Sequence, residues 1–204
     1  MLDDVKIKKI GKDTAALIAH LSFKIWQQED FRESINFDEI SQTEQDRIFN
    51  ELEVSFIGLC VLHLDSLKLQ IQSEEDLDII SKLQTATIWG FLDIYKERRI
   101  DQKNLNQWEV LIGMRIAEYR KDFELLMKES KKMKEFSSKK DYKYVWARVE
   151  TITLDMLSHI RRGKLEHKDP LRKHLQTAVI VLDQTFGHSI KKTVLGSLDS
   201  VGQN

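Results

Sequence analysis

Apolar side chains recur along this chain at intervals of three and four residues, the spacing that gives an α-helix one apolar face. Between Trp108 and Met127 the successive intervals are four, four, three, four and four residues. A strand could not bury that set on one side, because its side chains alternate between two faces. The pattern predicts six helices, at about residues 13–29, 41–71, 73–99, 104–127, 145–163 and 169–194.

Several of these boundaries carry residues that favour helix ends. Ser41 and Glu44 have the spacing of a capping box, in which a serine side chain bonds a backbone N–H three residues further on. Asp169 before Pro170 places an N-capping acid in front of a proline at the first helical position. Gly163 is suited to end the fifth helix, because glycine readily adopts the left-handed conformation found there.

The segment from Val54 to Leu64 is apolar almost all the way round a helix. Because a helix without a polar face is buried on every side, we expect this second helix at the centre of the fold. The sequence therefore predicts an all-α protein, a single bundle of about six helices. No connection resembles a flexible linker, so residues 1–204 are expected to form one domain, with residues 100–104 as the one candidate seam.

Composition agrees with this fold and narrows the setting. The chain has 8 Gly and 1 Pro among 204 residues, and 32% of its residues are charged, which favours few turns and long, solvated helices. Cys60 is the only cysteine, so a disulfide framework is excluded and a cytoplasmic location is expected. The longest apolar segment is well short of the ~20 residues that cross a bilayer, so we expect no membrane partner.

Motifs for metal and cofactor binding are absent from the sequence. The 6 histidines form no His-x3-His, His-Glu-x2-His or Glu-x2-His motif, so no metal site is expected. No glycine-rich phosphate loop occurs, and we expect no cofactor. Because no complete catalytic set is present either, the sequence favours a protein that is not an enzyme.

Charge is distributed unevenly between the two halves of the chain. Residues 1–102 hold 12 basic and 20 acidic side chains, a net charge of −8, and residues 103–204 hold 20 and 13, a net charge of +7. Opposite charge on the two halves suits self-association or binding to a charged partner. The leading hypothesis is a non-enzymatic protein-interaction module, a homodimer built from amphipathic helices.

Polar residues on and after the fifth helix support a first alternative function, that of a ribonuclease or RNA-binding bundle. Asp155 and His159, four residues apart, predict a carboxylate–imidazole pair. Arg162 and His167 have an Arg-x4-His spacing that resembles the active motif of the HEPN (higher eukaryotes and prokaryotes nucleotide-binding) helical ribonucleases. The resemblance implies that these two residues, from paired protomers, act on RNA without a metal. It covers six residues, and Gly163 stands where the family commonly has a polar residue.

A lysine-rich segment with interleaved aromatic residues follows the fourth helix. Lysines neutralise phosphates and aromatic rings stack on bases, so RNA is a candidate partner of this segment. The alternative is a solvated helix end. The residues concerned are Lys131, Lys132, Lys139, Lys140 and Tyr144.

Three helices carry a glycine near mid-length: Gly58, Gly90 and Gly113. Each costs about 1 kcal/mol of helix stability relative to alanine. Either the missing side chains leave a pocket for a small apolar ligand, rimmed by Trp89 and Trp108, or they let two helices approach closely. Close approach is the favoured interpretation, because protein interiors rarely keep empty volume.

Overall fold

The computed structural model describes residues 3–133, 142–166 and 168–190. Within these ranges the chain forms seven α-helices and one short 3-10 helix, without a strand. The all-α fold predicted from the periodicity is confirmed. The elements are α1 (Asp4–Trp26), α2 (Glu29–Ser34), η1 (Phe37–Glu39), α3 (Gln42–Lys68), α4 (Glu74–Glu97), α5 (Gln102–Ser130), α6 (Tyr142–Ile160) and α7 (Pro170–Ile190).

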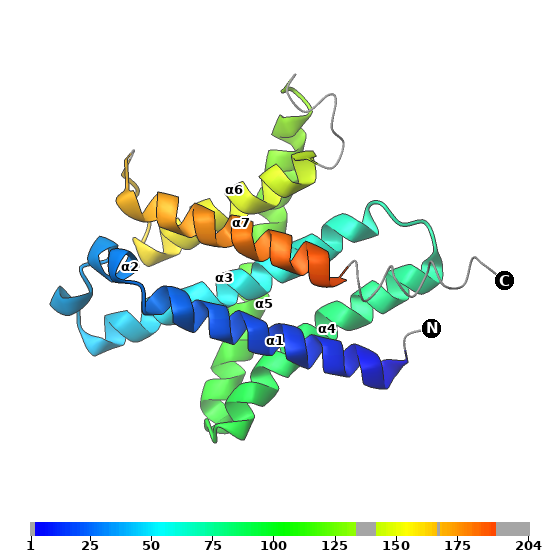
Figure 1. The fold of residues 1–204 in the computed structure, drawn as a ribbon, viewed down its shortest axis with the longest axis horizontal. Coiled ribbons are helices and arrows are strands. Elements are labelled where there is room, and N and C mark those ends of the chain that lie inside the picture. The colour runs from blue at the N-terminus through cyan, green and yellow to red at the C-terminus, as the bar shows by residue number, and fades with distance from the viewer. Residues whose placement is uncertain (1–2, 134–141, 167, 191–204) are drawn as a thin grey trace.

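Helix α3 lies at the centre of the bundle. It packs against α1 and α4 from the first half of the chain and against α5, α6 and α7 from the second half. Figure 1 shows α5 running across the direction of α1, α3 and α7. Every residue from Glu51 to Leu64 is buried, which confirms the central position predicted for this segment.

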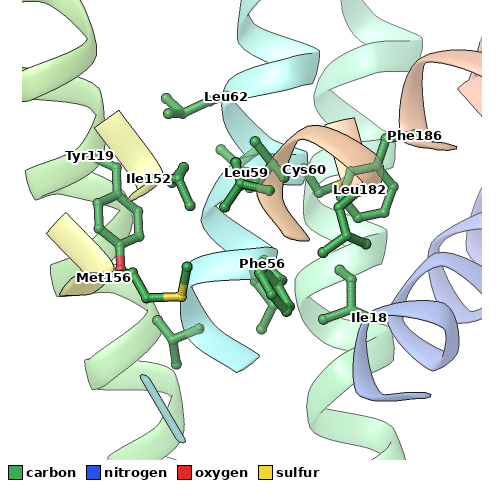
Figure 2. Close-up of a cluster of buried hydrophobic side chains, with 14 of the residues drawn as sticks. Ile18, Phe56, Leu59, Cys60, Leu62, Tyr119, Ile152, Met156, Leu182 and Phe186 are labelled. Atoms are coloured by element: carbon green, nitrogen blue, oxygen red, sulfur yellow. The ribbon is translucent and has the colours of Figure 1, made fainter. Parts of the chain in front are cut away.

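The core is formed by apolar side chains that converge on α3 from every neighbouring helix. Burying one large aliphatic or aromatic side chain stabilises a fold by about 1.5–3 kcal/mol, so a cluster of this kind supplies much of the driving force for folding. Figure 2 shows its centre, formed by Ile18, Phe56, Leu59, Cys60, Leu62, Tyr119, Ile152, Met156, Leu182 and Phe186.

Two helix starts follow from local capping. The side chain of Ser41 accepts a hydrogen bond from the backbone N–H of Glu44 at 3.3 Å, as the capping-box spacing predicts. The predicted start of the first helix near residue 13 is wrong, since α1 begins at Asp4. Its N-cap is Asp3, whose carboxylate accepts from the N–H of Lys6 at 2.8 Å, and its buried face already includes Ile7.

The segment between α1 and α3, predicted as a break, contains α2 and η1. Phe31 of α2 is fully buried and its ring lies 6.1 Å from that of Trp26. The guanidinium of Arg32 lies 3.7 Å from the centroid of the Phe37 ring, a cation–π contact. These contacts explain why a segment with a broken apolar pattern is nevertheless packed onto the bundle.

Helix α6 ends at Ile160, followed by Arg162 and Gly163 in the left-handed conformation. The N–H of Gly163 donates to the carbonyl of Ser158 at 2.8 Å and that of Arg162 to the carbonyl of His159 at 3.2 Å, the two bonds of a Schellman motif. The left-handed residue that ends this helix is therefore Arg162, and the predicted stop, Gly163, is the residue that follows it. Helix α7 begins at Pro170, as predicted. None of the helices in the described ranges is both long and apolar enough to cross a bilayer.

Candidate functional site

Three charged or polar side chains meet in the interior between α3, α6 and α7. Arg148 donates two hydrogen bonds to Asp183, from Nε to Oδ1 and from Nη2 to Oδ2, both at 2.8 Å. Nδ1 of His63 lies 3.0 Å from Oδ1 of the same carboxylate. His63, Arg148 and Asp183 are only 6%, 4% and 3% exposed. This arrangement is a buried ion pair to which an imidazole is added.

The protonation state of Asp183 follows from these contacts. Burial alone would raise its pKa, but the hydrogen bonds from His63 and Arg148 outweigh burial and hold the pKa at about 2. The carboxylate is therefore charged at neutral pH. Because it can only accept hydrogen bonds, Nδ1 of His63 carries the proton that points at it, which leaves Nε2 on the opposite edge of the ring.

All three residues line a cavity of about 490 Å³. Apolar surface predominates in its wall. The remaining lining residues are Ser66, Leu67, Gln70, Tyr144, Val145, Gln184, Gly187 and His188.

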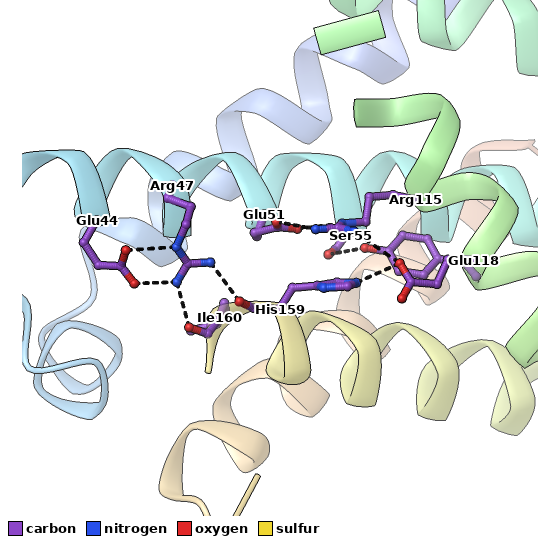
Figure 3. Close-up of polar contacts among 9 residues, drawn as sticks. Glu44, Arg47, Glu51, Ser55, Arg115, Glu118, His159 and Ile160 are labelled. Atoms are coloured by element: carbon purple, nitrogen blue, oxygen red, sulfur yellow. Dashed lines mark hydrogen bonds and ion pairs between the residues drawn. The ribbon is translucent and has the colours of Figure 1, made fainter. Parts of the chain in front are cut away.

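A second polar network joins α3 to α6 (Figure 3). Arg47 pairs with Glu44, with Nη2 2.6 Å from Oε1, and also donates to the carbonyls of His159 and Ile160, each at 2.8 Å. These carbonyls belong to the last turn of α6, where backbone acceptors have no partner within the helix. Arg47 thus caps the C-terminus of α6, and its positive charge interacts favourably with the negative end of the helix dipole.

Further along α3, Arg115 of α5 forms a two-bond ion pair with Glu51, at 2.7 and 3.0 Å (Figure 3). Its Nη1 also lies 3.3 Å from Glu118, which in turn lies 2.9 Å from Nε2 of His159. The network fixes α5 against α3 and α6. Its residues satisfy one another, which indicates a structural role.

The predicted Asp155–His159 pair is replaced by the contact between His159 and Glu118, because Glu118 reaches the imidazole from α5. Oδ2 of Asp155 is buried and has no hydrogen-bond partner among the described residues. Burial, together with the nearby carboxylates of Asp122 and Glu118, raises the pKa of Asp155 to about 7, against a smaller opposing effect of Arg115.

Arg162 is placed away from the polar face of α6. The helix ends before it, and the exposed Arg162 side chain pairs with Glu44, with Nη2 2.5 Å from Oε2. It therefore does not continue the face of α6 that carries Asp155 and His159. His167, its partner in the HEPN-like motif, lies outside the described residues, so a role in RNA cleavage stays a prediction.

The lysine-rich segment is only partly described. Lys131 and Lys132 are exposed at the end of α5, where Lys132 pairs with Glu129 at 2.7 Å. Tyr144 is half-buried and lines the cavity next to His63. Lys139 and Lys140 lie outside the described residues, and binding of RNA by this segment stays a prediction.

The three mid-helix glycines have different surroundings and are not gathered around one cavity. A Cβ atom at Gly58 would lie 2.3 Å from Cδ2 of Tyr119, and one at Gly90 would lie 2.9 Å from the Cα of Lys12. Both positions allow close packing, of a ring at Gly58 and of a backbone at Gly90. Nothing lies within 4 Å of a Cβ added at Gly113.

The two tryptophans are also separated. Trp89 is exposed and lines, with Gly90, a surface groove of about 800 Å³ between α1 and α4. Trp108 is half-buried and stacks on Tyr95 with ring centroids 5.1 Å apart. Two lysines of the groove form ion pairs, Lys12 with Glu97 at 2.7 Å and Lys82 with Asp78 at 2.9 Å.

Helix α5 carries large apolar side chains on its outer face. Val110, Met114 and Leu125 are 62%, 61% and 50% exposed. Gly113 and Ala117 are exposed on the same face. We call these five residues the α5 face. Val110 and Met114 also line a shallow hollow of about 660 Å³.

Sequence reasoning identified neither the α5 face nor the buried cluster as a site. The spacing of Val110, Met114, Ala117 and Leu125 is itself helical and could have indicated a second apolar stripe. No local signal could have joined His63 to a residue 120 positions away.

Comparison with known proteins gave no match to this chain among protein-family models, curated proteins or solved structures. Within the described ranges, no three histidine, cysteine, aspartate or glutamate side chains are grouped so that they could hold a metal ion.

Proposed function

We propose that this protein is a non-enzymatic helical interaction module that forms a homodimer by pairing the α5 face with the same face of a second copy. The observation that supports it most is the exposure of Val110, Met114 and Leu125 along one side of a long helix. At ~100° per residue, the apolar members of this face lie within about 80° of one another. Val110, Met114 and Ala117 form the apolar centre of this face, and the exposed Lys121 separates them from Leu125. Grouped apolar surface of this kind marks interaction sites.

A second copy is favoured as the partner because the α5 face is complementary to itself. Gly113 leaves open space beside the protruding side chain of Met114. In a two-fold dimer the same patch must supply both the projection and the hollow. An antiparallel pairing about an axis between these two residues sets Met114 of each copy against Gly113 of the other.

Charges at the two ends of the α5 face fit the same arrangement. Lys103 and Glu124 lie on this side of the helix, each about 16 Å from the axis at 1.5 Å per residue. Neither forms an ion pair with another of the described residues. An antiparallel pair brings Lys103 of one copy opposite Glu124 of the other, twice by symmetry.

A non-enzymatic role agrees with the state of the single cysteine. Cys60 is fully buried, and burial raises the pKa of its thiol to about 12, so it is not a nucleophile at neutral pH. With no second cysteine in the sequence to form an intramolecular disulfide, the proposed setting is the reducing cytoplasm.

Sedimentation velocity of the full chain over a range of micromolar concentrations tests the dimer. The wild type is expected to dimerise and Met114→Glu to remain monomeric, because the new carboxylate would be buried without a partner. The matched control is Val181→Glu, which changes an exposed valine of α7 and should leave the dimer intact. A wild type that is monomeric throughout, or a Met114→Glu variant that dimerises equally well, would contradict the proposal.

Charge reversal tests the antiparallel geometry separately. Lys103→Glu should weaken the dimer several-fold, since it places like charges opposite each other at two symmetric points. The double variant Lys103→Glu with Glu124→Lys should restore it. Failure of the double variant to recover affinity would rule out this register.

A further inference from the structure

Two nitrogen atoms of the buried cluster remain available for a ligand. His63 and Arg148 lie far apart in the sequence, yet both line the cavity between α3, α6 and α7. Both residues are more than nine-tenths buried. The carboxylate of Asp183 accepts hydrogen bonds from Nδ1 of His63 and from Nε and Nη2 of Arg148. Among the described residues, Nε2 of His63 and Nη1 of Arg148 have no hydrogen-bond partner. Because both residues line the cavity, a partner from outside the chain could bond these two nitrogens there.

Gly187 of α7 keeps the imidazole edge open. A Cβ atom at this position would lie 3.2 Å from Cε1 and 3.7 Å from Nε2 of His63. Glycine within a helix costs about 1 kcal/mol relative to alanine. Its presence here leaves Nε2 facing the cavity, where an alanine methyl group would cover it.

The chemistry of the cavity restricts what can fill it. Arg148 is always charged, so an atom bonded to its Nη1 must be an acceptor. Asp183 already accepts three hydrogen bonds and pairs with the guanidinium, which leaves no anionic group free to attract a cation. Leu67, Val145 and the ring of Tyr144 supply apolar wall.

We infer that this cavity is a binding site for a small organic monocarboxylate, whose carboxyl group bonds Nη1 of Arg148 and Nε2 of His63 while its apolar body contacts Leu67, Val145 and Tyr144. A volume of about 490 Å³ suits a compact molecule of this class. The carboxylate would form charge-assisted hydrogen bonds, the stronger kind in a buried setting. The site is independent of the α5 face and does not rest on dimerisation.

Benzoate is the probe, and its neutral analogue benzamide is the matched control. Titrations of the full chain at pH 6.5 are followed through the imidazole 15N resonances of His63 and by calorimetry. Benzoate is expected to bind with a dissociation constant of about 1 mM, as its few atoms allow, and benzamide at least about tenfold more weakly. If benzoate leaves the His63 resonances unchanged at ~20 mM, or benzamide binds equally well, the inference is overturned.

Two variants test the position of the bound group. Gly187→Ala should weaken benzoate binding by about tenfold or more, because its methyl group covers Nε2, whereas Gly113→Ala on α5 should not change it. His63→Asn keeps a donor near Asp183 but removes Nε2, and should weaken binding similarly. Melting temperatures of all three variants establish that they are folded. Unchanged benzoate affinity in both Gly187→Ala and His63→Asn would overturn the assignment.

Discussion

Gly58 of α3 lies directly against the aromatic ring of Tyr119 of α5, so closely that no side chain fits between them. The hydroxyl of Tyr119 also lies 2.9 Å from that of Ser55, one turn earlier on α3. The ring is fully buried and is held at both its edge and its hydroxyl. This contact fixes the inner side of α5 against the core and thereby determines which side of α5 faces outward.

Replacing Gly58 by alanine should therefore destabilise the protein. The added Cβ would lie 2.3 Å from Cδ2 of Tyr119, and the enclosed ring cannot move without disturbing its neighbours. Overpacking of this kind costs about 1–3 kcal/mol, more than the helix propensity gained from alanine. Gly113→Ala is the control, expected to raise the free energy of unfolding by up to about 1 kcal/mol because its surroundings are open. Urea denaturation at low protein concentration measures the free energy of unfolding of both variants. If Gly58→Ala is as stable as the wild type, the Tyr119 ring can move aside at little cost.

Most of the helical fold could be predicted from the sequence, because helix periodicity and capping are local. Ser41 marks a helix start through its bond to the N–H of Glu44, and Pro170 marks one through its fixed φ. The end of α6 is likewise local, because Arg162 and Gly163 both adopt the left-handed conformation. The early start of α1 and the presence of α2 were missed. The apolar pattern is weak in both segments, so their helices depend on tertiary contacts such as the burial of Phe31.

The candidate sites were harder to predict, because each depends on tertiary contacts. His63 and Asp183 are 120 positions apart, and Arg148 joins them from a third helix. Asp155 was expected to bind His159 four residues on, but an acid on another helix competes successfully for that imidazole. Periodicity indicates that a side chain is polar or apolar on a face and leaves open which helix that face meets.

Asp183→Asn should strongly destabilise the protein, because it leaves the charge of Arg148 buried without its partner. Loss of one member of a buried pair typically costs about 3–5 kcal/mol. Since the pKa of Asp183 is depressed to about 2 in the fold, its stabilising effect is present above about pH 4 and is lost as the pH falls toward 2. The difference in unfolding free energy between wild type and variant should shrink over that interval. Asp4→Asn, at an exposed ion pair with Lys82, is the control and should change stability little.

Asp155→Asn should have the opposite dependence on pH. The pKa of Asp155 is raised to about 7, so the folded state favours the protonated acid, and its contribution to stability is greatest below about pH 4 and is lost as the pH rises to 7. At pH 8 the variant should be more stable than wild type by about 1–2 kcal/mol, after allowing for solvent access, with little difference at pH 4. Denaturant titrations at the two pH values measure this. Asp122→Asn should lower the pH at which Asp155 loses its proton in the folded state, since it removes a carboxylate that disfavours the charged form of Asp155. Equal stability of wild type and Asp155→Asn at pH 8 would contradict the raised pKa.

Arg99→Gly should stabilise the protein by relieving backbone strain at the end of α4. Arg99 has a φ of 62°, and the following N–H, that of Ile100, donates to the carbonyl of Tyr95 at 3.2 Å, the closing bond of a Schellman motif. A non-glycine residue in this left-handed conformation costs about 1–2 kcal/mol, of which part is offset by the greater freedom of glycine in the unfolded chain. We expect the free energy of unfolding to rise by about 1 kcal/mol and the melting temperature by about 2–4 °C.

Arg99→Ala, which removes the same charge but keeps the strain, should change stability little, and Lys96→Gly within the helix should lower it by about 1 kcal/mol. Equal melting temperatures for Arg99→Gly and Arg99→Ala would show that the left-handed residue is not strained.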